Sequence, residues 1–254
     1  MILVSGCSWS DSNFKTDYHP GMDHSYKKWF DYIETDEKIV SIGVCGHSND
    51  SIIDKALTEI FVKPNITKVV LALTEWTRFK FLKHEIHPAL LVLKDLYESN
   101  PNPDDAILTL TKHIDEWISH HSKWLKLDKL EPHHYVPDVV NRTLLKLQTI
   151  QEVCKSRGIE LYVFQMVWPL NHDCEELGVT TLIKNEIFQK MYGEDNDNFI
   201  NFPFIRKLGG ECVETLLKRR KDYNTCTVSE IDRHPNGKGH RVIGEWFNEQ
   251  VKLL

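Results

Sequence analysis

A serine near the start of the chain stands where it could serve as a nucleophile. Gly6-Cys7-Ser8-Trp9-Ser10 follows the apolar run Ile2–Ser5. A small residue before a serine at the carboxyl end of a buried strand lets the chain turn sharply, which lifts the hydroxyl to the sheet edge where α/β folds bind ligands. The alternative is an ordinary turn in which Ser8 or Ser10 caps the next segment. For this short motif alone, the capping alternative is the commoner outcome.

A histidine with a nearby acid lies at the far end of the chain, within Asp232-Arg233-His234-Pro235-Asn236-Gly237-Lys238-Gly239-His240. An acid two residues before a histidine can hold the Nδ1–H of the imidazole and leave Nε2 as a general base. The alternative is a capping aspartate beside a surface histidine. The whole run, Asp-x-His-Pro-Asn-x-x-Gly-His, is more specific than a single Asp-x-His and favours the catalytic interpretation.

Together the two motifs resemble blocks of the SGNH (GDSL-like) hydrolase superfamily, which has four. A third block is visible in the segment 41–50, Ser-Ile-Gly-Val-Cys-Gly-His-Ser-Asn-Asp, whose oxyanion-hole glycine maps onto Gly46. The remaining block, usually Gly-x-Asn-Asp after the third strand, falls at Leu73–Arg78, which contains no asparagine. Its Trp76-Thr77-Arg78 ending resembles a variant in SGNH-like proteins of large tailed phages and their hosts. The resemblance covers both ends of the chain but not residues 79–138.

This resemblance implies a flavodoxin-like three-layer α/β/α sandwich with a mostly parallel sheet, and hydrolysis of esters, acetyl groups or thioesters. Ser8 would attack the acyl carbon after His234 takes its proton, with Asp232 orienting the ring. The backbone N–H groups of Ser8 and Gly46 would stabilise the oxyanion. The Ser…Asp…His order also occurs in α/β-hydrolases, but their Gly-x-Ser-x-Gly elbow is absent.

We therefore expect a serine esterase that acts on a small ester or an O-acetylated carbohydrate through an acyl-enzyme on Ser8. The alternative is a catalytically degenerate SGNH-like protein that binds a ligand, or a phage structural or assembly protein. The absent asparagine bears on this choice, because loss of one oxyanion donor typically costs about 100- to 1000-fold in rate.

The residues around the missing asparagine supply further candidates. Thr74 is a candidate replacement donor in the oxyanion hole. Arg78 could grip an anionic substrate through its planar guanidinium, or equally form a salt bridge with Glu75. Trp76 could stack on a sugar ring, although a buried core tryptophan is the commoner outcome. Glu75, Trp76 and Arg78 are the predicted substrate-binding residues.

The elements that must position these residues follow from the apolar patterns. Four short β-branched runs predict strands buried on both faces of a parallel sheet: Ile2–Ser5, Lys38–Ile42, Lys68–Leu73 and Ile159–Met166. Amphipathic spacing predicts helices at Asp50–Val62, Val139–Arg157 and Gly239–Leu254. This alternation indicates an α/β sandwich.

Two stretches do not fit the alternation. Residues 79–138 contain a Pro-Asn-Pro break at 101–103 and a helical pattern over Asp104–Leu127, so we expect a helical insertion in a single domain that spans 1–254. Residues 169–220 are expected to be irregular, apart from a candidate short strand at Phe199–Phe202.

Most of the 13 histidines fall in the predicted insertion or beside it. His84-x-x-His87, His120-His121 and His133-His134 suggest a metal site, but zinc sites need three or four convergent ligands. We expect solvated histidines here, with no metal and no cofactor.

Composition excludes several classes of protein. With 31 basic and 37 acidic residues the net charge is -6, which argues against binding nucleic acid through backbone charge and against a polybasic membrane anchor. No apolar run approaches the ~20 residues that span a bilayer, and the start lacks the features of a signal peptide. Six singly spread cysteines are typical of reduced thiols.

We therefore expect a cytoplasmic protein, in the setting of a phage-infected bacterium if the phage resemblance holds. Its expected partner is a small-molecule ester or acylated carbohydrate, with neither nucleic acid nor membrane. The oligomeric state is left open.

Overall fold

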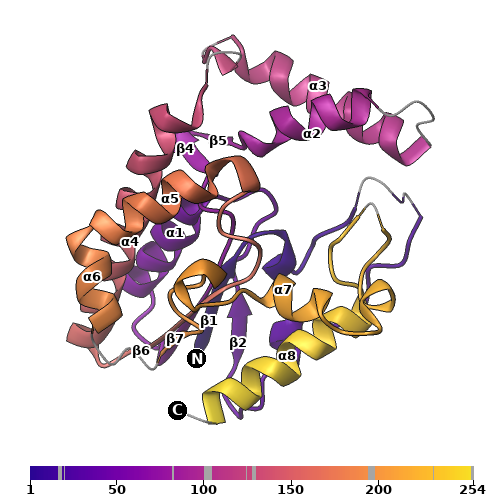
Figure 1. Ribbon diagram of the computed structural model, residues 1–254. Coiled ribbons are helices and arrows are strands. Elements are labelled where there is room, and N and C mark those ends of the chain that lie inside the picture. Colours follow the sequence, from indigo (N-terminus) through magenta and orange to yellow (C-terminus); the bar gives the residue numbers. More distant parts are fainter. Residues whose placement is uncertain are drawn as a thin grey trace.

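A parallel five-stranded sheet with the strand order β2-β1-β3-β6-β7 lies at the centre of the structure (Figure 1), a computed structural model. It describes residues 1–16, 19, 21–81, 83–99, 105–123, 125–127, 130–193, 198–230 and 232–252. The strands are β1 (Ile2–Gly6), β2 (Ile39–Ser41), β3 (Lys68–Leu73), β6 (Glu160–Gln165) and β7 (Phe199–Ile200).

The order of these strands confirms the predicted fold class. Counted along the chain, the sheet runs 2-1-3-4-5, which is the flavodoxin-like order. Val4 of β1 pairs with Ser41 on one side and with Val70 on the other. The chain therefore reverses its winding direction next to β1, and the carboxyl ends of β1 and β3 flank the crevice where such folds bind ligands.

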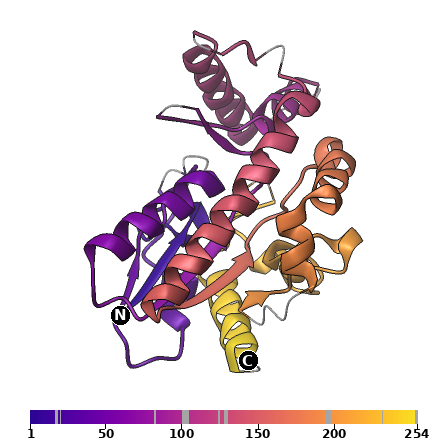
Figure 2. The same cartoon turned by 90° about the vertical axis from the view of Figure 1, so that its left-hand side faces the viewer.

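Helices cover both faces of the sheet (Figures 1 and 2). On one face lie α1 (Asn49–Val62) and α4 (Pro132–Arg157). On the other face lies α8 (Gly237–Lys252), together with the 3-10 helix η2 (Trp29–Tyr32). Phe247 of α8 packs on Phe164 of β6 with ring centroids 5.7 Å apart, and Trp29 packs on the same ring at 5.3 Å. Central strand residues such as Leu3 and Leu71 are consequently inaccessible to solvent.

The predicted helices are confirmed with shifted ends. α4 begins at Pro132 rather than Val139, because proline is tolerated in the first turn and Pro137 costs only one intrahelical hydrogen bond. α8 begins at Gly237 because the side-chain oxygen of Asn236 accepts the N–H groups of Lys238 and Gly239, at 3.0 and 3.1 Å.

In the described part of residues 79–138, a hairpin and the helices α2 (Ala89–Glu98) and α3 (Asp105–His121) lie beyond the carboxyl edge of the sheet (Figure 1), and α4 begins at Pro132. The hairpin joins β4 (Phe79–Phe81) to β5 (His84–Ile86), and α2 packs beside α3. The predicted helix over Asp104–Leu127 thus ends at His121. Asp104 and the Pro-Asn-Pro break at 101–103 lie outside the described residues. That this segment is an insertion in a single domain stays a prediction.

The prediction that residues 169–220 are irregular is wrong. This stretch contains α5 (His172–Lys184), α6 (Glu186–Gly193) and α7 (Val213–Lys218). Short helices draw most of their stability from packing rather than from local propensity, and here α5 and α6 pack against α4. The candidate strand at Phe199–Phe202 is present as β7, two residues long.

No helix in the described part of the chain is both long and apolar enough to cross a bilayer.

Candidate active site

Ser8, Asp232 and His234 form one hydrogen-bonded series at the carboxyl end of β1. The Nε2 atom of His234 lies 2.8 Å from the Ser8 hydroxyl oxygen. The Nδ1 atom of the same ring lies 2.5 Å from Asp232 Oδ1. Because a carboxylate only accepts, the proton sits on Nδ1 and the lone pair of Nε2 faces the serine hydroxyl.

The turn that carries Ser8 is fixed by close packing. Ser8 begins the 3-10 helix η1 (Ser8–Ser10), two residues after β1 ends at Gly6. A Cβ atom on Gly6 would lie 2.7 Å from Ser10 Cβ and 3.1 Å from the carbonyl oxygen of Ala72, so only glycine fits there. The Ser10 hydroxyl accepts the indole N–H of Trp29 at 3.1 Å. These contacts hold Ser8 at the sheet edge, where it is 7% exposed.

A folded-back loop positions His234 opposite Ser8. Thr227 forms an antiparallel bridge with Pro235, and the N–H of Val228 donates to the carbonyl oxygen of His234 at 2.8 Å. The side-chain amide of Asn236 donates to the carbonyl oxygen of Thr227 at 2.8 Å. The Pro-Asn that follows the histidine therefore ties this loop to the start of α8.

Asp232 is buried, at 2% exposed, and ionised. Burial by itself would raise the pKa of its carboxyl group, but hydrogen bonds from His234 and Thr16 and the electrostatic interaction with the His234 ring outweigh burial and lower that pKa. The backbone N–H of His234 also donates to Asp232 Oδ1, at 3.1 Å. A carboxylate held in this way can orient the imidazole and stabilise its protonated form.

An aromatic ring that the sequence did not point to packs on the same imidazole. Phe14 stacks on His234 with ring centroids 4.3 Å apart and an interplanar angle of 29°. Phe14 belongs to the loop that follows Ser8, so one loop supplies both the hydroxyl and a wall for the base. An aromatic residue close to Ser8 in the sequence was the only available signal.

Gly46 lies in the loop after β2 and takes up a backbone conformation that favours glycine, with φ +83°. The N–H of the preceding Cys45 donates to Asp11 Oδ2 at 3.0 Å, and the N–H of Val44 donates to the carbonyl oxygen of Gly6 at 3.1 Å. The loop is therefore fastened to the Ser8 turn, as an oxyanion hole shared between Ser8 and Gly46 requires.

His87 fastens the other side of Gly46. Its Nε2 atom lies 2.6 Å from the carbonyl oxygen of Gly46 and donates to it. Burial and the charge of Arg78 lower the pKa of the His87 imidazole to about 3, so the ring is neutral at ordinary pH. The sequence pointed to His87 only as part of a possible metal pair and did not point to Asp11, because both contacts join loops that meet only in the fold.

Thr74, the candidate replacement donor, is inaccessible to solvent. The side chain of Asn49 in α1 forms two hydrogen bonds with the backbone of Thr74. The Oδ1 atom of Asn49 accepts the Thr74 N–H at 2.8 Å, and the Nδ2 atom of Asn49 donates to the Thr74 carbonyl oxygen at 3.1 Å. The Thr74 hydroxyl has no hydrogen-bond partner within the described part of the chain. Thr74 could act as an oxyanion donor only if a substrate oxygen reached this buried position.

The structure corrects the role predicted for Trp76. Its side chain is inaccessible to solvent, and its indole N–H donates to Gln165 Oε1 at 2.8 Å, so it cannot stack on a sugar ring. Trp76 follows a buried strand and continues into the core. Arg78 donates through Nε to Glu75 Oε2 at 3.0 Å, which is the salt bridge that the alternative reading anticipated. Contact of Glu75 or Arg78 with a substrate stays a prediction.

The prediction of solvated histidines is wrong for His121, which is 9% exposed. The spacing His84-x-x-His87 does not form a pair, since His87 contacts Gly46 while His84 lies beside His120 and His121. These three rings form a separate group on residues 79–138, and the described residues of the Ser8 site include no second group of this kind.

Comparison with known proteins adds little to this geometry. No family model matches the chain, and no curated protein matches it. Among solved structures, a protein from Parabacteroides merdae ATCC 43184 that is proposed to be a GDSL-like lipase shares 10% sequence identity with it at a TM-score of 0.47. That match covers 100% of this chain and 95% of the other. So distant a likeness supports no functional argument.

Proposed function

We propose that this chain is a serine hydrolase of the SGNH (GDSL-like) type that cleaves a small carboxylic ester through an acyl-enzyme on Ser8. The observation that carries the proposal is the series Ser8–His234–Asp232, with successive distances of 2.8 and 2.5 Å. Hydrogen-bond reach between nucleophile, base and orienting acid is the geometric requirement for activating a serine.

In the proposed reaction, His234 Nε2 takes the Ser8 proton as Oγ forms a bond to the acyl carbon. The N–H groups of Ser8 and Gly46 donate to the resulting oxyanion. The tetrahedral intermediate collapses, the bond to the alcohol oxygen breaks, and His234 returns the proton to that oxygen. Water then repeats the sequence on the acyl-enzyme and releases the acid. Asp232 stays ionised throughout and stabilises the imidazolium.

The O-acetylated carbohydrate is the narrower substrate hypothesis, and it loses one support because Trp76 offers no stacking surface. The absence of an oxyanion-hole asparagine still favours the alternative, a binding role without turnover, which includes a phage structural or assembly role. Residues 73–78 contain no asparagine, and the Thr74 hydroxyl is buried.

Hydrolysis of p-nitrophenyl acetate by the full chain distinguishes these roles. We expect turnover by the wild-type chain and a loss of about 1000-fold or more in kcat for Ser8→Ala. Ser12→Ala is the matched control, because Ser12 is exposed and belongs to the same loop. Equal rates for wild type and Ser8→Ala, with both proteins folded by circular dichroism, would overturn the proposal and favour the binding role.

A further inference from the structure

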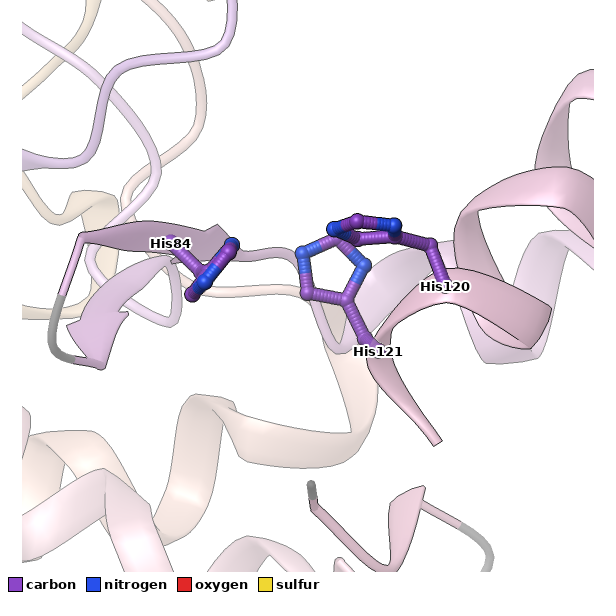
Figure 3. A group of neighbouring side chains, drawn as sticks. All are labelled: His84, His120 and His121. Atoms are coloured by element: carbon purple, nitrogen blue, oxygen red, sulfur yellow. The ribbon is translucent and has the colours of Figure 1, made fainter. Parts of the chain in front are cut away.

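Three histidines from two separate elements come together outside the Ser8 site. His84 is the first residue of β5, and His120 and His121 are the last two residues of α3. Figure 3 shows the rings of His120 and His121 directed toward the ring of His84. One ring nitrogen from each histidine can be chosen so that all three lie within 4.8 Å of one another.

This spacing is close to what a tetrahedral metal ion needs. Zn–N bonds of about 2.0–2.1 Å place the nitrogen ligands of a tetrahedral ion about 3.4 Å apart. The three ring nitrogens would therefore have to approach one another by at most about 1.4 Å. His120 is exposed and can rotate to supply part of that approach.

Two contacts with Trp117 hold the imidazole of His121 in an orientation that suits a metal ligand. Its Nδ1 lies 2.8 Å from the carbonyl oxygen of Trp117 and donates to it, so the lone pair is on Nε2. The Trp117 ring packs against the same imidazole, with centroids 4.7 Å apart. A hydrogen bond from the other ring nitrogen to a backbone carbonyl is the usual support of a metal-binding histidine, since it fixes both tautomer and ring direction.

The chemistry of the three side chains selects the kind of ion. The ligand group found among the described residues consists of imidazoles without a carboxylate. Imidazole nitrogen suits Zn²⁺, Ni²⁺ and Cu²⁺, whereas Mg²⁺ and Ca²⁺ prefer oxygen ligands.

We propose that His84, His120 and His121 bind a divalent transition-metal ion of the Zn²⁺ class, which joins β5 to the C-terminal end of α3. Water would complete the coordination. The site lies on the segment that contains His87, and β5 leads directly to that residue and its contact with Gly46. A bound ion would thus fix the base of the α2–α3 pair relative to the loop beside Ser8.

Titration with Zn²⁺ tests this proposal independently of any esterase activity. The full chain is freed of metal with a chelator and titrated calorimetrically, using wild type and His120→Gln. His120 is exposed, so we expect its replacement to leave folding intact, which circular dichroism checks. We expect one Zn²⁺ per chain and an affinity at least about 10-fold weaker for His120→Gln, since loss of a supporting residue alone costs about 10- to 100-fold.

A control on the same helix separates this site from chance binding. His113 is an exposed residue of α3 outside the group, so His113→Gln should bind Zn²⁺ as the wild type does. Because Cys45 is an exposed thiol, Co²⁺ is used as a second probe: histidine ligation gives visible ligand-field bands without a thiolate charge-transfer band. No saturable binding by the wild type, equal affinity in wild type, His120→Gln and His84→Gln, or a thiolate band would each overturn the proposal.

Discussion

Phe14 lies nearly parallel to His234, with ring centroids 4.3 Å apart and ring planes 29° apart. The imidazole is thus held on its edge by the Asp232 carboxylate and on its face by a hydrocarbon ring. The stacked Phe14 ring blocks rotation of the imidazole toward that face, and this helps to keep Nε2 directed at Ser8.

Phe14→Leu should lower kcat and leave KM nearly unchanged, because the change loosens the base without touching a substrate. A stacked aromatic pair contributes about 1 kcal/mol beyond its burial, which corresponds to about fivefold in rate. Phe188→Leu in α6 is the control, since it truncates another buried aromatic ring far along the chain. Ester turnover measured on both variants decides the matter, and an unchanged kcat in Phe14→Leu would show that the stack does not position the base.

Asp232→Asn should lower kcat by about 10⁴-fold while keeping the fold. The amide is the same size as the carboxylate but can donate to Nδ1, and this would place the imidazole in the tautomer that presents N–H to Ser8. Asp222→Asn is the matched control, because Asp222 is a partly exposed carboxylate paired with Arg220 and Lys238. Comparable activity in the two variants would contradict the role given to Asp232.

Gly46→Ala should lower kcat by about 10- to 100-fold. The added methyl group meets no close atom, but a φ of +83° is strained for alanine, so the loop would relax and its N–H would lose its direction. Gly158→Ala, at φ +66° in the C-cap of α4, carries a similar backbone strain away from the site. It should lose stability without losing kcat, and parallel activity losses in both variants would point to general destabilisation.

The stability of the fold should fall as the pH drops below about 6.5, in part because of His240. This residue is 2% exposed, and its Nδ1 accepts the backbone N–H of Trp29 at 3.2 Å. Burial, Lys28 and His234 lower the pKa of its ring well below the ordinary 6.5. Near pH 6.5 His240 binds a proton in the unfolded chain but not in the folded chain. Its contribution to the free energy of unfolding is therefore complete above pH 6.5 and is lost as the pH falls.

Urea unfolding at several pH values measures this effect. A group that binds one proton only in the unfolded chain makes the free energy of unfolding fall by about 1.4 kcal/mol for each pH unit below its unfolded pKa. In His240→Asn the Oδ1 atom can still accept the Trp29 N–H, but the residue does not titrate. The slope of the free energy of unfolding against pH should therefore decrease by about 1.4 kcal/mol per pH unit. An unchanged slope would mean that His240 takes up its proton in the fold.

Strands and site motifs were predictable from the sequence for the same reason. Continuous apolar runs mark strands buried on both faces, and Ser8 comes two residues after the first of these strands ends. The role of His234 could be predicted because Asp232 lies only two residues away and the contact between them is local. The helices α5 to α7 were not, since their stability comes from packing on α4 and other parts of the fold.

The parts of the site that the sequence did not reveal depend on contacts between distant loops. Asp11 meets Cys45, and His87 meets Gly46, only after the sheet has formed. Trp76 was predicted to bind substrate although a buried tryptophan is the commoner outcome, because its buried partner Gln165 lies on another strand and only the fold brings the two together. His84 likewise meets the neighbouring pair His120 and His121 only in the fold.

Reaction with a fluorophosphonate probe, followed by intact mass measurement and peptide mapping, tests the central claim most directly. The reagent requires an activated serine hydroxyl beside an oxyanion site, so it reports the chemistry without knowledge of the substrate. The account predicts a single adduct on Ser8 in the wild-type chain, none in Ser8→Ala, and much slower labelling of His234→Ala. A folded wild-type chain that forms no adduct, or forms it on another residue, would contradict the account.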